Sequence, residues 1–242
     1  MSTKVHEKIL VITPHYYLAE TCGSTHTDIA HSQEEEWTHL KSALSAAAQT
    51  NNNRLTFYTD GSLARNSDDP FHPVMGSAWY NTETGLSGKH RIEGYASSTN
   101  PEAKAVLLAL EACPPDTDVH IYTDSQSTHN ITAKIASGQY WDIPISHILK
   151  MGCWFTWEAI AGITKSKNIH LTLHKVAAHS GDLNNDRADL AAMEAREQQE
   201  ITYFCNSDSS RIAFALAHRR GLVEENPRKF LKHLTQNVRR TN

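Results

Sequence analysis

The sequence predicts an α/β fold built on a mixed five-stranded sheet with helices on both faces. Three β-favouring runs follow one another with short connections, which is typical of an antiparallel meander. Two further β runs then alternate with helical patterns, and right-handed crossovers make such strands parallel to the first. The chain has 242 residues, enough for one sizeable domain with appendages or for two small domains.

The antiparallel part is expected first along the chain. An Ala-rich helix over residues 37–49 ends at the breaker Asn51-Asn52-Asn53. The first strand follows at 55–62, and two more follow at 74–80 and 86–96, joined by a turn near Asn81–Gly85.

The alternating part begins with clear helix-start signals in Thr99-Asn100-Pro101-Glu102. These are a capping Thr or Asn, a proline at the first helical position and an acidic first turn. The helix is expected to end at Cys113, before two prolines. The remaining predicted elements are a strand at 118–124, a helix at 125–137, a Trp-rich helical stretch at 141–165, a strand at 169–176 and a helix at 183–200.

A repeated tripeptide marks the ends of two predicted strands. Tyr58-Thr59-Asp60 closes the first strand, and Tyr122-Thr123-Asp124 closes the fourth. In open α/β sheets, ligands bind at the carboxyl ends of the strands. Two aspartates on neighbouring strands would form a concentrated negative site, which is typical of hard divalent cations.

Glu102 and Asp189 are further candidates for this site, from the first turn of one helix and from the last helix. Four converging carboxylates repel one another and raise each other's pKa values, a conflict that two Mg²⁺ ions remove. Each residue alone also has a purely structural explanation: an Asx turn for Asp60, complementation of the helix dipole for Glu102, a helix cap for Asp124, and a surface ion pair with Arg187 or Lys175 for Asp189.

Composition limits the compartment and the partners. No apolar run approaches the length of a membrane span, and the apolar run at residues 9–12 is too short for a secretory signal. Four separated cysteines indicate a reducing compartment without disulfides or a zinc site. We therefore expect a monomeric intracellular protein, cytoplasmic or nuclear and not secreted, with no membrane partner.

Charge is unevenly distributed over three expected regions. Residues 1–53, an N-terminal extension without an assigned role, have a net charge of −3, and the domain at 54–200 has −6. Residues 201–242 form a basic C-terminal helical tail with a net charge of +5. Such a tail adds attraction to a polyanion, although a simple solvated helix is an equal alternative.

Four motifs in order resemble those of ribonuclease H type 1, especially the version found in retroelements. The resemblance covers residues 55–197, and all four motifs together are highly specific. The motifs are Tyr58-Thr59-Asp60-Gly61-Ser62, Ser98-Thr99-Asn100-Pro101-Glu102-Ala103, Tyr122-Thr123-Asp124-Ser125-Gln126, and Val176-Ala177-Ala178-His179-Ser180-Gly181-Asp182 followed by Asn184-Asn185-Asp186-Arg187-Ala188-Asp189.

The resemblance implies a ribonuclease H-like fold and a set of roles. The family's metal-binding carboxylates match Asp60, Glu102, Asp124 and Asp189, which would hold two Mg²⁺ ions, with Mn²⁺ as a substitute. His179 matches the mobile-loop histidine that helps proton transfer or product departure. The positions that match nucleic-acid contacts are Gly61, Ser62, Thr99, Asn100 and Asn185, with Ser125 and Gln126 as weaker candidates.

Two departures from the family pattern stand out. Where many cellular relatives carry a Lys-rich helix and loop that grip the DNA strand, this chain has aromatic residues whose spacing predicts a core-facing helix: Trp141, Trp154, Phe155 and Trp157. A strong electrostatic grip is therefore not expected from this segment, and the basic tail could substitute. Pro101 is the second departure, and it is compatible with a first-turn position.

The function implied is a Mg²⁺-dependent endonuclease that cuts the RNA strand of RNA–DNA hybrids with little sequence specificity. One alternative is another nuclease or an integrase of the same fold. A second is a catalytically inactive, retroelement-derived nucleic-acid-binding module. The retroelement character also implies a reverse transcriptase or polyprotein context, in which residues 1–53 could be a remnant of a polymerase connection, a lid or a partner-binding arm.

Overall fold

The computed structural model describes residues 9–12, 29–64, 74–92, 96–178, 181–198, 201–202, 211–212, 215–218 and 221–232. The elements in chain order are β1 (Ile9–Ile12), α2 (Ile29–Thr50), β2 (Arg54–Ala64), β3 (Val74–Asn81), β4 (Ser87–Ile92), α3 (Thr99–Ala112), β5 (Asp118–Thr123), α4 (Gln126–Ala136), the 3₁₀-helix η1 (Gln139–Asp142), α5 (Ile145–Ile148), α6 (Trp154–Ser166), β6 (His170–Lys175), α7 (Leu183–Ala195), β7 (Ile201–Thr202), β8 (Ala215–His218) and β9 (Gly221–Leu222).

The central sheet has the strand order β6-β5-β2-β3-β4-β7. Strands β2, β3 and β4 are antiparallel neighbours, whereas β5 is parallel to β2 and β6 is parallel to β5. The predicted mixed five-stranded sheet is therefore confirmed. The two-residue strand β7 adds a short parallel pairing at the β4 edge.

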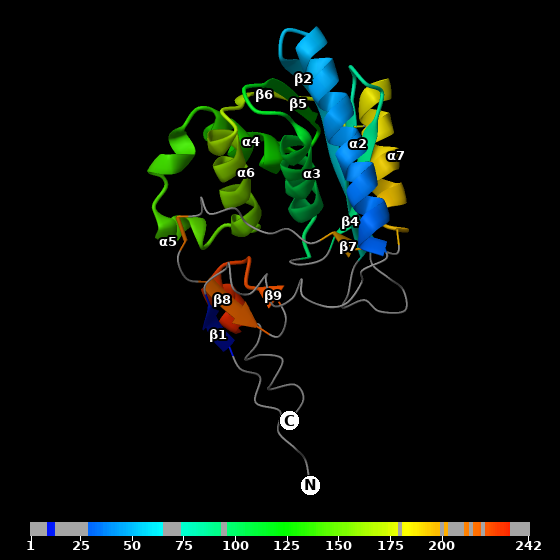
Figure 1. Ribbon diagram of the computed structural model, residues 1–242. Coiled ribbons are helices and arrows are strands. Elements are labelled where there is room, and N and C mark those ends of the chain that lie inside the picture. Colours follow the sequence, from blue (N-terminus) through cyan, green and yellow to red (C-terminus); the bar gives the residue numbers. More distant parts are fainter. Residues whose placement is uncertain are drawn as a thin grey trace.

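Helices cover both faces of this sheet, as predicted. Figure 1 shows α3 and α6 on one side of the sheet and α7 on the other. The side of α3 and α6 contains the main core, in which Phe57 meets Trp79 edge to face with ring centroids 5.5 Å apart. Trp154 and Trp157 are also fully buried there, so the prediction that the aromatic segment faces the core is confirmed.

The Trp-rich stretch at 141–165 is not the single helical stretch that the sequence predicts. It is divided among η1, α5 and α6. Pro144 precedes α5 and lacks the N–H that a continuous helix needs. Cys153 has a left-handed backbone with φ of 58° directly before α6, which interrupts the helical path again.

The N-terminal side contributes more than an irregular extension. Helix α2 begins at Ile29, earlier than the predicted start at Trp37, and buries Leu40, Leu44 and Ala48 in the main core. A separate three-stranded sheet has the order β1-β8-β9, and in it Ile9 pairs with His218. Figure 1 shows this small sheet below α5 and α6.

The predicted helical tail needs correction. Among the described residues after 200, only 227–232 are helical, whereas β7, β8 and β9 are strands. These strands exist because they pair with partners far away in the chain, β8 with β1 and β7 with β4. Local propensity does not reveal such pairings, because context and cross-strand neighbours decide the stability of a strand.

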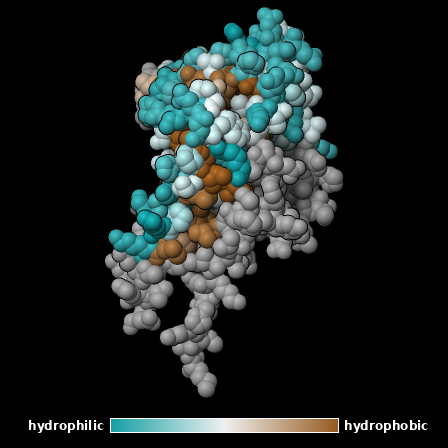
Figure 2. Space-filling model, turned by 90° about the vertical axis from the view of Figure 1, so that its left-hand side faces the viewer, coloured by the Kyte–Doolittle hydropathy of each residue, from teal (hydrophilic) through white to brown (hydrophobic). Residues whose placement is uncertain are grey.

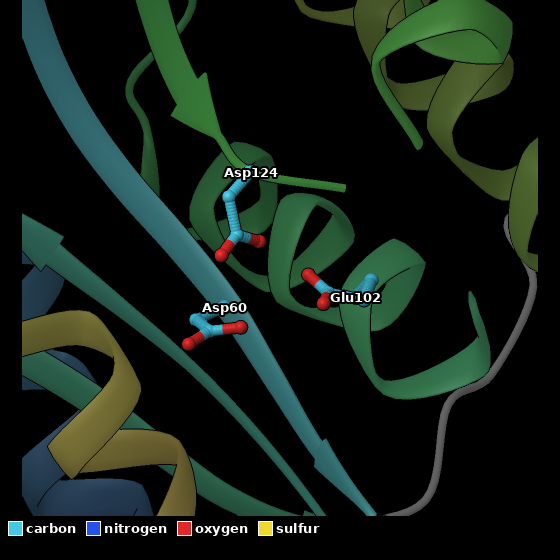
Figure 3. Close-up of side chains that lie close together, drawn as sticks. All are labelled: Asp60, Glu102 and Asp124. Carbon is cyan, nitrogen blue, oxygen red and sulfur yellow. The ribbon is translucent and has the colours of Figure 1, made fainter. Parts of the chain in front are cut away.

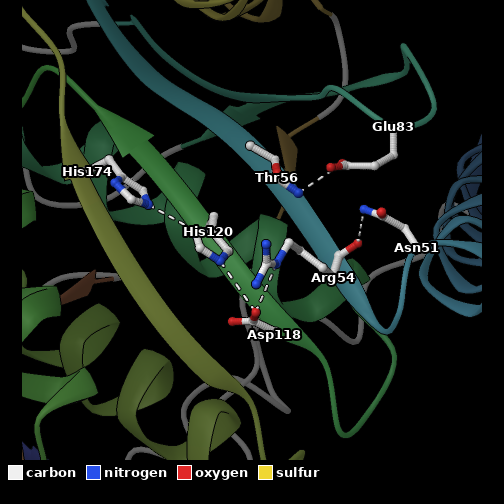
Figure 4. Close-up of polar contacts among 7 residues, drawn as sticks. All are labelled: Asn51, Arg54, Thr56, Glu83, Asp118, His120 and His174. Carbon is white, nitrogen blue, oxygen red and sulfur yellow. Dashed lines mark hydrogen bonds and ion pairs between the residues drawn. The ribbon is translucent and has the colours of Figure 1, made fainter.

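Polar side chains join the parallel strands to one another. Arg54 at the start of β2 donates to Asp118 at the start of β5 over 3.0 Å, and His120 Nδ1 in the middle of β5 lies 2.9 Å from His174 Nε2 of β6 (Figure 4).

Of the helices that the structure describes, none is long and apolar enough to cross a membrane.

Candidate metal centre

Three carboxylates meet at the carboxyl end of the central strands. Asp60, Glu102 and Asp124 each offer an oxygen, and these oxygens lie within 4.8 Å of one another. Figure 3 shows the three side chains converging from β2, from the first turn of α3 and from the end of β5. This is the juxtaposition predicted for these three residues from the order of the strands.

The repeated tripeptide explains why the two aspartates are neighbours. Strands β2 and β5 pair in parallel with Tyr58 opposite Tyr122, so the two copies of the sequence lie in register. The tyrosine rings stack with centroids 4.7 Å apart and an interplanar angle of 15°. Two residues further along each strand, on the same face, Asp60 and Asp124 come side by side.

Glu102 reaches the site because α3 approaches β2 very closely. A Cβ atom added at Gly61 would lie 2.2 Å from the Glu102 amide nitrogen, so only glycine fits there. Ser77, which pairs with Gly61 across the β2–β3 ladder, donates its hydroxyl hydrogen to the Pro101 carbonyl oxygen over 2.7 Å. Gly61 and Ser77 therefore position the Pro101–Glu102 peptide together.

The electrostatics of the three carboxylates favour a cation. Burial, and then the charge of Asp124, raise the pKa of Asp60 from 3.8 to about 7. Burial, followed by the charges of Asp60 and Asp124, raises the pKa of Glu102 well above its usual range. The buried Oε2 atom of Glu102 has no hydrogen-bond partner among the described residues. A divalent cation would relieve the repulsion and satisfy this oxygen, so these residues fit a divalent metal ion.

Asp189 lies near this group but outside the three-carboxylate cluster. Its charge also helps to raise the pKa of Asp60, although less than burial and Asp124 do. Helix α7 brings it close through small residues, since a Cβ atom at Gly76 of β3 would lie 2.2 Å from the Ala192 carbonyl oxygen. The side chain is partly exposed, which leaves it accessible to a ligand between α7 and β2.

The contacts of Ser125 and Lys175 bear on the purely structural explanations of Asp124 and Asp189. Ser125, not Asp124, caps α4, because its hydroxyl oxygen accepts from the Thr128 amide at 3.4 Å. Lys175 Nζ donates to the carbonyl oxygens of Asp124 and Val176. Neither structural explanation of these two carboxylates is supported by these contacts.

Arg187, the second suggested partner of Asp189, has other contacts. Its guanidinium donates to the Tyr80 hydroxyl over 2.6 Å and to the Asn184 side chain over 3.3 Å. It also lies 5.0 Å from the centre of the Tyr80 ring. These bonds join the first turns of α7 to β3 and so contribute to the position of Asp189.

The predicted nucleic-acid contacts surround the carboxylates in part. The Gly61 amide donates to Asp60 Oδ1 over 2.7 Å, and Ser62 and Thr99 are partly exposed beside the site. Asn100 is buried, with its amide bonded to Ser97 Oγ over 3.1 Å. Asn185 is buried near the start of α7, and its Oδ1 atom has no partner among the described residues.

Ser125 and His179 differ from the other predicted site residues. The structure assigns Ser125 a capping role in α4, as described above. His179 lies outside the described residues, so its place relative to the carboxylates stays a prediction. Sequence reasoning missed Ser77, because only the register of the β2–β3 ladder shows that its hydroxyl reaches α3.

A family model described as RNase H matches residues 52–197 of this chain. The chain belongs to the RNase H family. A search of curated proteins gives no match. All four carboxylates of the site therefore lie within the part of the chain that carries the family pattern, and the extensions at both ends lie outside it.

Solved structures of RNase H domains are also similar to this chain. The PFV RNase H domain is 19% identical, with a TM-score of 0.44, over 59% of this chain and 94% of that one. A foamy viral protease-reverse transcriptase in complex with an RNA/DNA hybrid is 18% identical, with a TM-score of 0.44, over 59% of this chain and 20% of that one. LC9-RNase H1, a type 1 enzyme with the type 2 active-site motif, is 14% identical, with a TM-score of 0.45, over 73% and 80%.

Proposed function

We propose that this RNase H family protein is a divalent-metal-dependent endonuclease that hydrolyses the RNA strand of RNA–DNA hybrids. The observation that carries the proposal is the convergence of Asp60, Glu102 and Asp124, with ligand oxygens within 4.8 Å of one another. Membership of the RNase H family supports the same class of chemistry. By resemblance, the products carry 5′-phosphate and 3′-hydroxyl ends.

The carboxylates would hold two Mg²⁺ ions, with Asp189 as the fourth member of the set. The chemistry that two bound divalent cations supply is activation of a water and stabilisation of the leaving oxygen in an in-line displacement. Burial of Asp60 and Glu102 makes this chemistry sensitive to position, because a charge in a desolvated site interacts strongly with its neighbours. His179 is proposed to help proton transfer or product departure.

Selection of RNA is proposed to come from the partly exposed residues beside the carboxylates. A protein distinguishes RNA from DNA locally through the 2′-hydroxyl groups in the wide minor groove. Gly61, Ser62 and Thr99 are the partly exposed candidates for these contacts, whereas Asn100 and Asn185, candidates by resemblance, are buried. Since these groups address backbone and sugar rather than base edges, we expect little sequence specificity.

The test is cleavage of a uniform RNA–DNA hybrid with a labelled RNA strand, in Mg²⁺ and in EDTA. We expect cleavage only with the metal, and loss of cleavage in Asp60→Asn with hybrid binding retained. Asp118→Asn is the matched control, because Asp118 is a carboxylate at the opposite end of β5. Wild-type turnover in the Asp60→Asn variant would contradict the proposed endonuclease mechanism.

A substrate panel separates the alternatives. An integrase or another nuclease of this fold would prefer duplex DNA or single-stranded substrates over the hybrid. A catalytically inactive binding module would bind the hybrid without cutting it at any metal concentration. The intracellular location, the monomeric state and a reverse transcriptase context are proposed on the sequence alone, and gel filtration of the full chain tests the second of these.

A further inference from the structure

The described residues between Arg211 and Lys232, here called the C-terminal arm, are firmly docked on the RNase H domain. The Arg211 guanidinium pairs with Glu158 over 2.9 Å, and its backbone amide donates to the other carboxylate oxygen over 3.1 Å. Glu158 is only 1% exposed. The guanidinium also lies over the rings of Tyr140 and Trp141, at 5.2 and 4.8 Å from their centres.

A second set of contacts fixes the arm at the start of α6. The indole nitrogen of Trp154 donates to the Val223 carbonyl oxygen over 2.9 Å, and the Cys153 amide donates to the Glu224 carbonyl oxygen over 3.0 Å. Val223 and Glu224 are themselves buried. Two independent anchors therefore hold the arm in a defined place.

This place is at the end of the sheet where the carboxylates lie. Cys153 Sγ is 3.6 Å from Ser97 Oγ, which accepts from the Asn100 amide at the start of α3. Glu102 lies in the first turn of the same helix. These contacts connect the arm, through the N-terminal end of α6, to the start of the helix that carries Glu102.

Acidic residues outnumber basic ones in the rest of the domain. Residues 54–200 contain twelve Lys and Arg against eighteen Asp and Glu, whereas residues 201–242 contain eight against three. Near the carboxylates, Lys175 donates to the carbonyl oxygens of Asp124 and Val176, and Arg187 donates to Tyr80 and Asn184. Figure 2 shows a brown, apolar band on the side of the molecule where Figure 1 places α5.

The C-terminal region adds positive charge that this acidic domain lacks overall, which favours attraction of a polyanion to the arm. Arg228 and Lys229 are exposed and have no acidic side-chain partner among the described residues. We propose that the C-terminal arm is a fixed phosphate-binding surface in which Arg228 and Lys229 contact the backbone of a nucleic acid held at the carboxylates. The identity of this ligand as an RNA–DNA hybrid rests on the proposed function.

The contacts also show which variant is suitable for a test. Deleting the arm would remove Arg211 and leave the buried Glu158 carboxylate without its partner, so loss of binding after deletion would not be interpretable. Neutralising exposed side chains avoids this problem. The double variant Arg228→Ser/Lys229→Ser removes two charges without touching an anchor.

The experiment measures the Kd of the full-length chain for an RNA–DNA hybrid in EDTA by fluorescence anisotropy, over a range of KCl concentrations. We expect the double variant to bind about three- to tenfold more weakly and to lower the slope of log Kd against log salt by about 1–2, since each lost phosphate contact removes roughly 0.9. Lys41→Ser/Arg54→Ser is the matched control, because it removes two exposed charges from α2 and from the opposite end of β2. This control is expected to keep the wild-type slope.

An unchanged affinity and slope in the Arg228→Ser/Lys229→Ser variant would overturn the proposal, as would equal losses in both double variants. Wild-type protein that does not bind the hybrid would overturn it as well. Binding with the expected charge dependence but without Mg²⁺-dependent cleavage would instead refute only the proposed endonuclease. The two proposals therefore fail in distinguishable ways.

Discussion

Gly61 lies directly opposite Ser77 in the β2–β3 ladder, and both residues contact the same peptide, Pro101–Glu102. Gly61 leaves room for this peptide because it has no side chain, and Ser77 donates a hydrogen bond to it. This relationship places a buried glutamate from the start of a helix beside two aspartates that end strands. The geometry of the candidate metal centre therefore depends on two residues that are not expected to bind metal themselves through a side chain.

The substitution Gly61→Ala should disrupt the centre. Its Cβ atom would lie 2.2 Å from backbone atoms of Glu102, which have little freedom to move, so α3 must shift. We expect cleavage to fall by about a hundredfold and stability to fall by about 1–3 kcal/mol. Steady-state cleavage and urea denaturation measure these effects. Gly85→Ala is the control. An alanine with a φ of +70° is strained, but its Cβ atom would meet no neighbour within 4 Å. This variant should lose stability and keep the wild-type kcat.

The substitution Ser77→Ala should weaken metal binding more than it weakens folding. It removes one buried hydrogen bond to the Pro101 carbonyl, worth about 1 kcal/mol. Because Glu102 then becomes less well positioned, the Mg²⁺ concentration for half-maximal cleavage should rise, with kcat near wild type at saturating Mg²⁺. Thr164→Ala removes an equivalent hydroxyl-to-carbonyl bond within α6 and should leave the Mg²⁺ titration unchanged. Identical titrations for wild type and Ser77→Ala would contradict this role.

Stability without metal should depend on pH through Asp60. Its pKa is raised from 3.8 to about 7 in the folded protein, mainly by burial and by Asp124. The folded state therefore keeps a proton that the unfolded chain releases near pH 4. The resulting destabilisation is absent below about pH 4, grows as pH rises and is complete above about pH 7, with a size on the order of 4 kcal/mol.

Thermal melting in EDTA at about pH 5 and about pH 8 tests this prediction. The melting temperature should be lower at the higher pH, and Asp60→Asn should reduce the difference because it removes the titrating carboxyl. Addition of Mg²⁺ at the higher pH should raise the melting temperature of the wild type, since the ion binds the folded state. Equal melting of the wild type at both pH values would show that the carboxyl repulsion is unimportant.

The buried ion pair of the C-terminal arm makes a separate prediction. Arg211→Ala leaves the Glu158 carboxylate buried without its cation, and we expect a loss of about 3–5 kcal/mol in the free energy of unfolding. The double variant Arg211→Met/Glu158→Leu should recover most of this loss, because it removes both charges. Arg54→Ala breaks an exposed pair and should cost about 0–1 kcal/mol. Urea denaturation of the full chain distinguishes these outcomes.

The sequence placed a residue correctly where a pattern of a few neighbouring residues fixes its position. The doubled Tyr-Thr-Asp predicts two strand ends, and right-handed crossovers make those strands parallel neighbours. The start signals around Pro101 likewise put Glu102 in a first helical turn, as observed. By contrast, the prediction of a helical C-terminal tail was wrong, because β8 forms by pairing with β1, which lies far away in the chain.

The sequence by itself therefore determined the order of the five central strands, the burial of Trp154 and Trp157 and the end of the sheet at which carboxylates gather. Periodicity, caps and chain direction act over a few residues, so they can be read along the chain. Only the tertiary structure decided that Ser77 reaches Pro101, that Lys175 is bonded to carbonyl oxygens, and that Arg211 docks the C-terminal arm beside Glu158. These contacts join residues far apart in the chain, and their geometry depends on strand register and close packing, which no local pattern specifies.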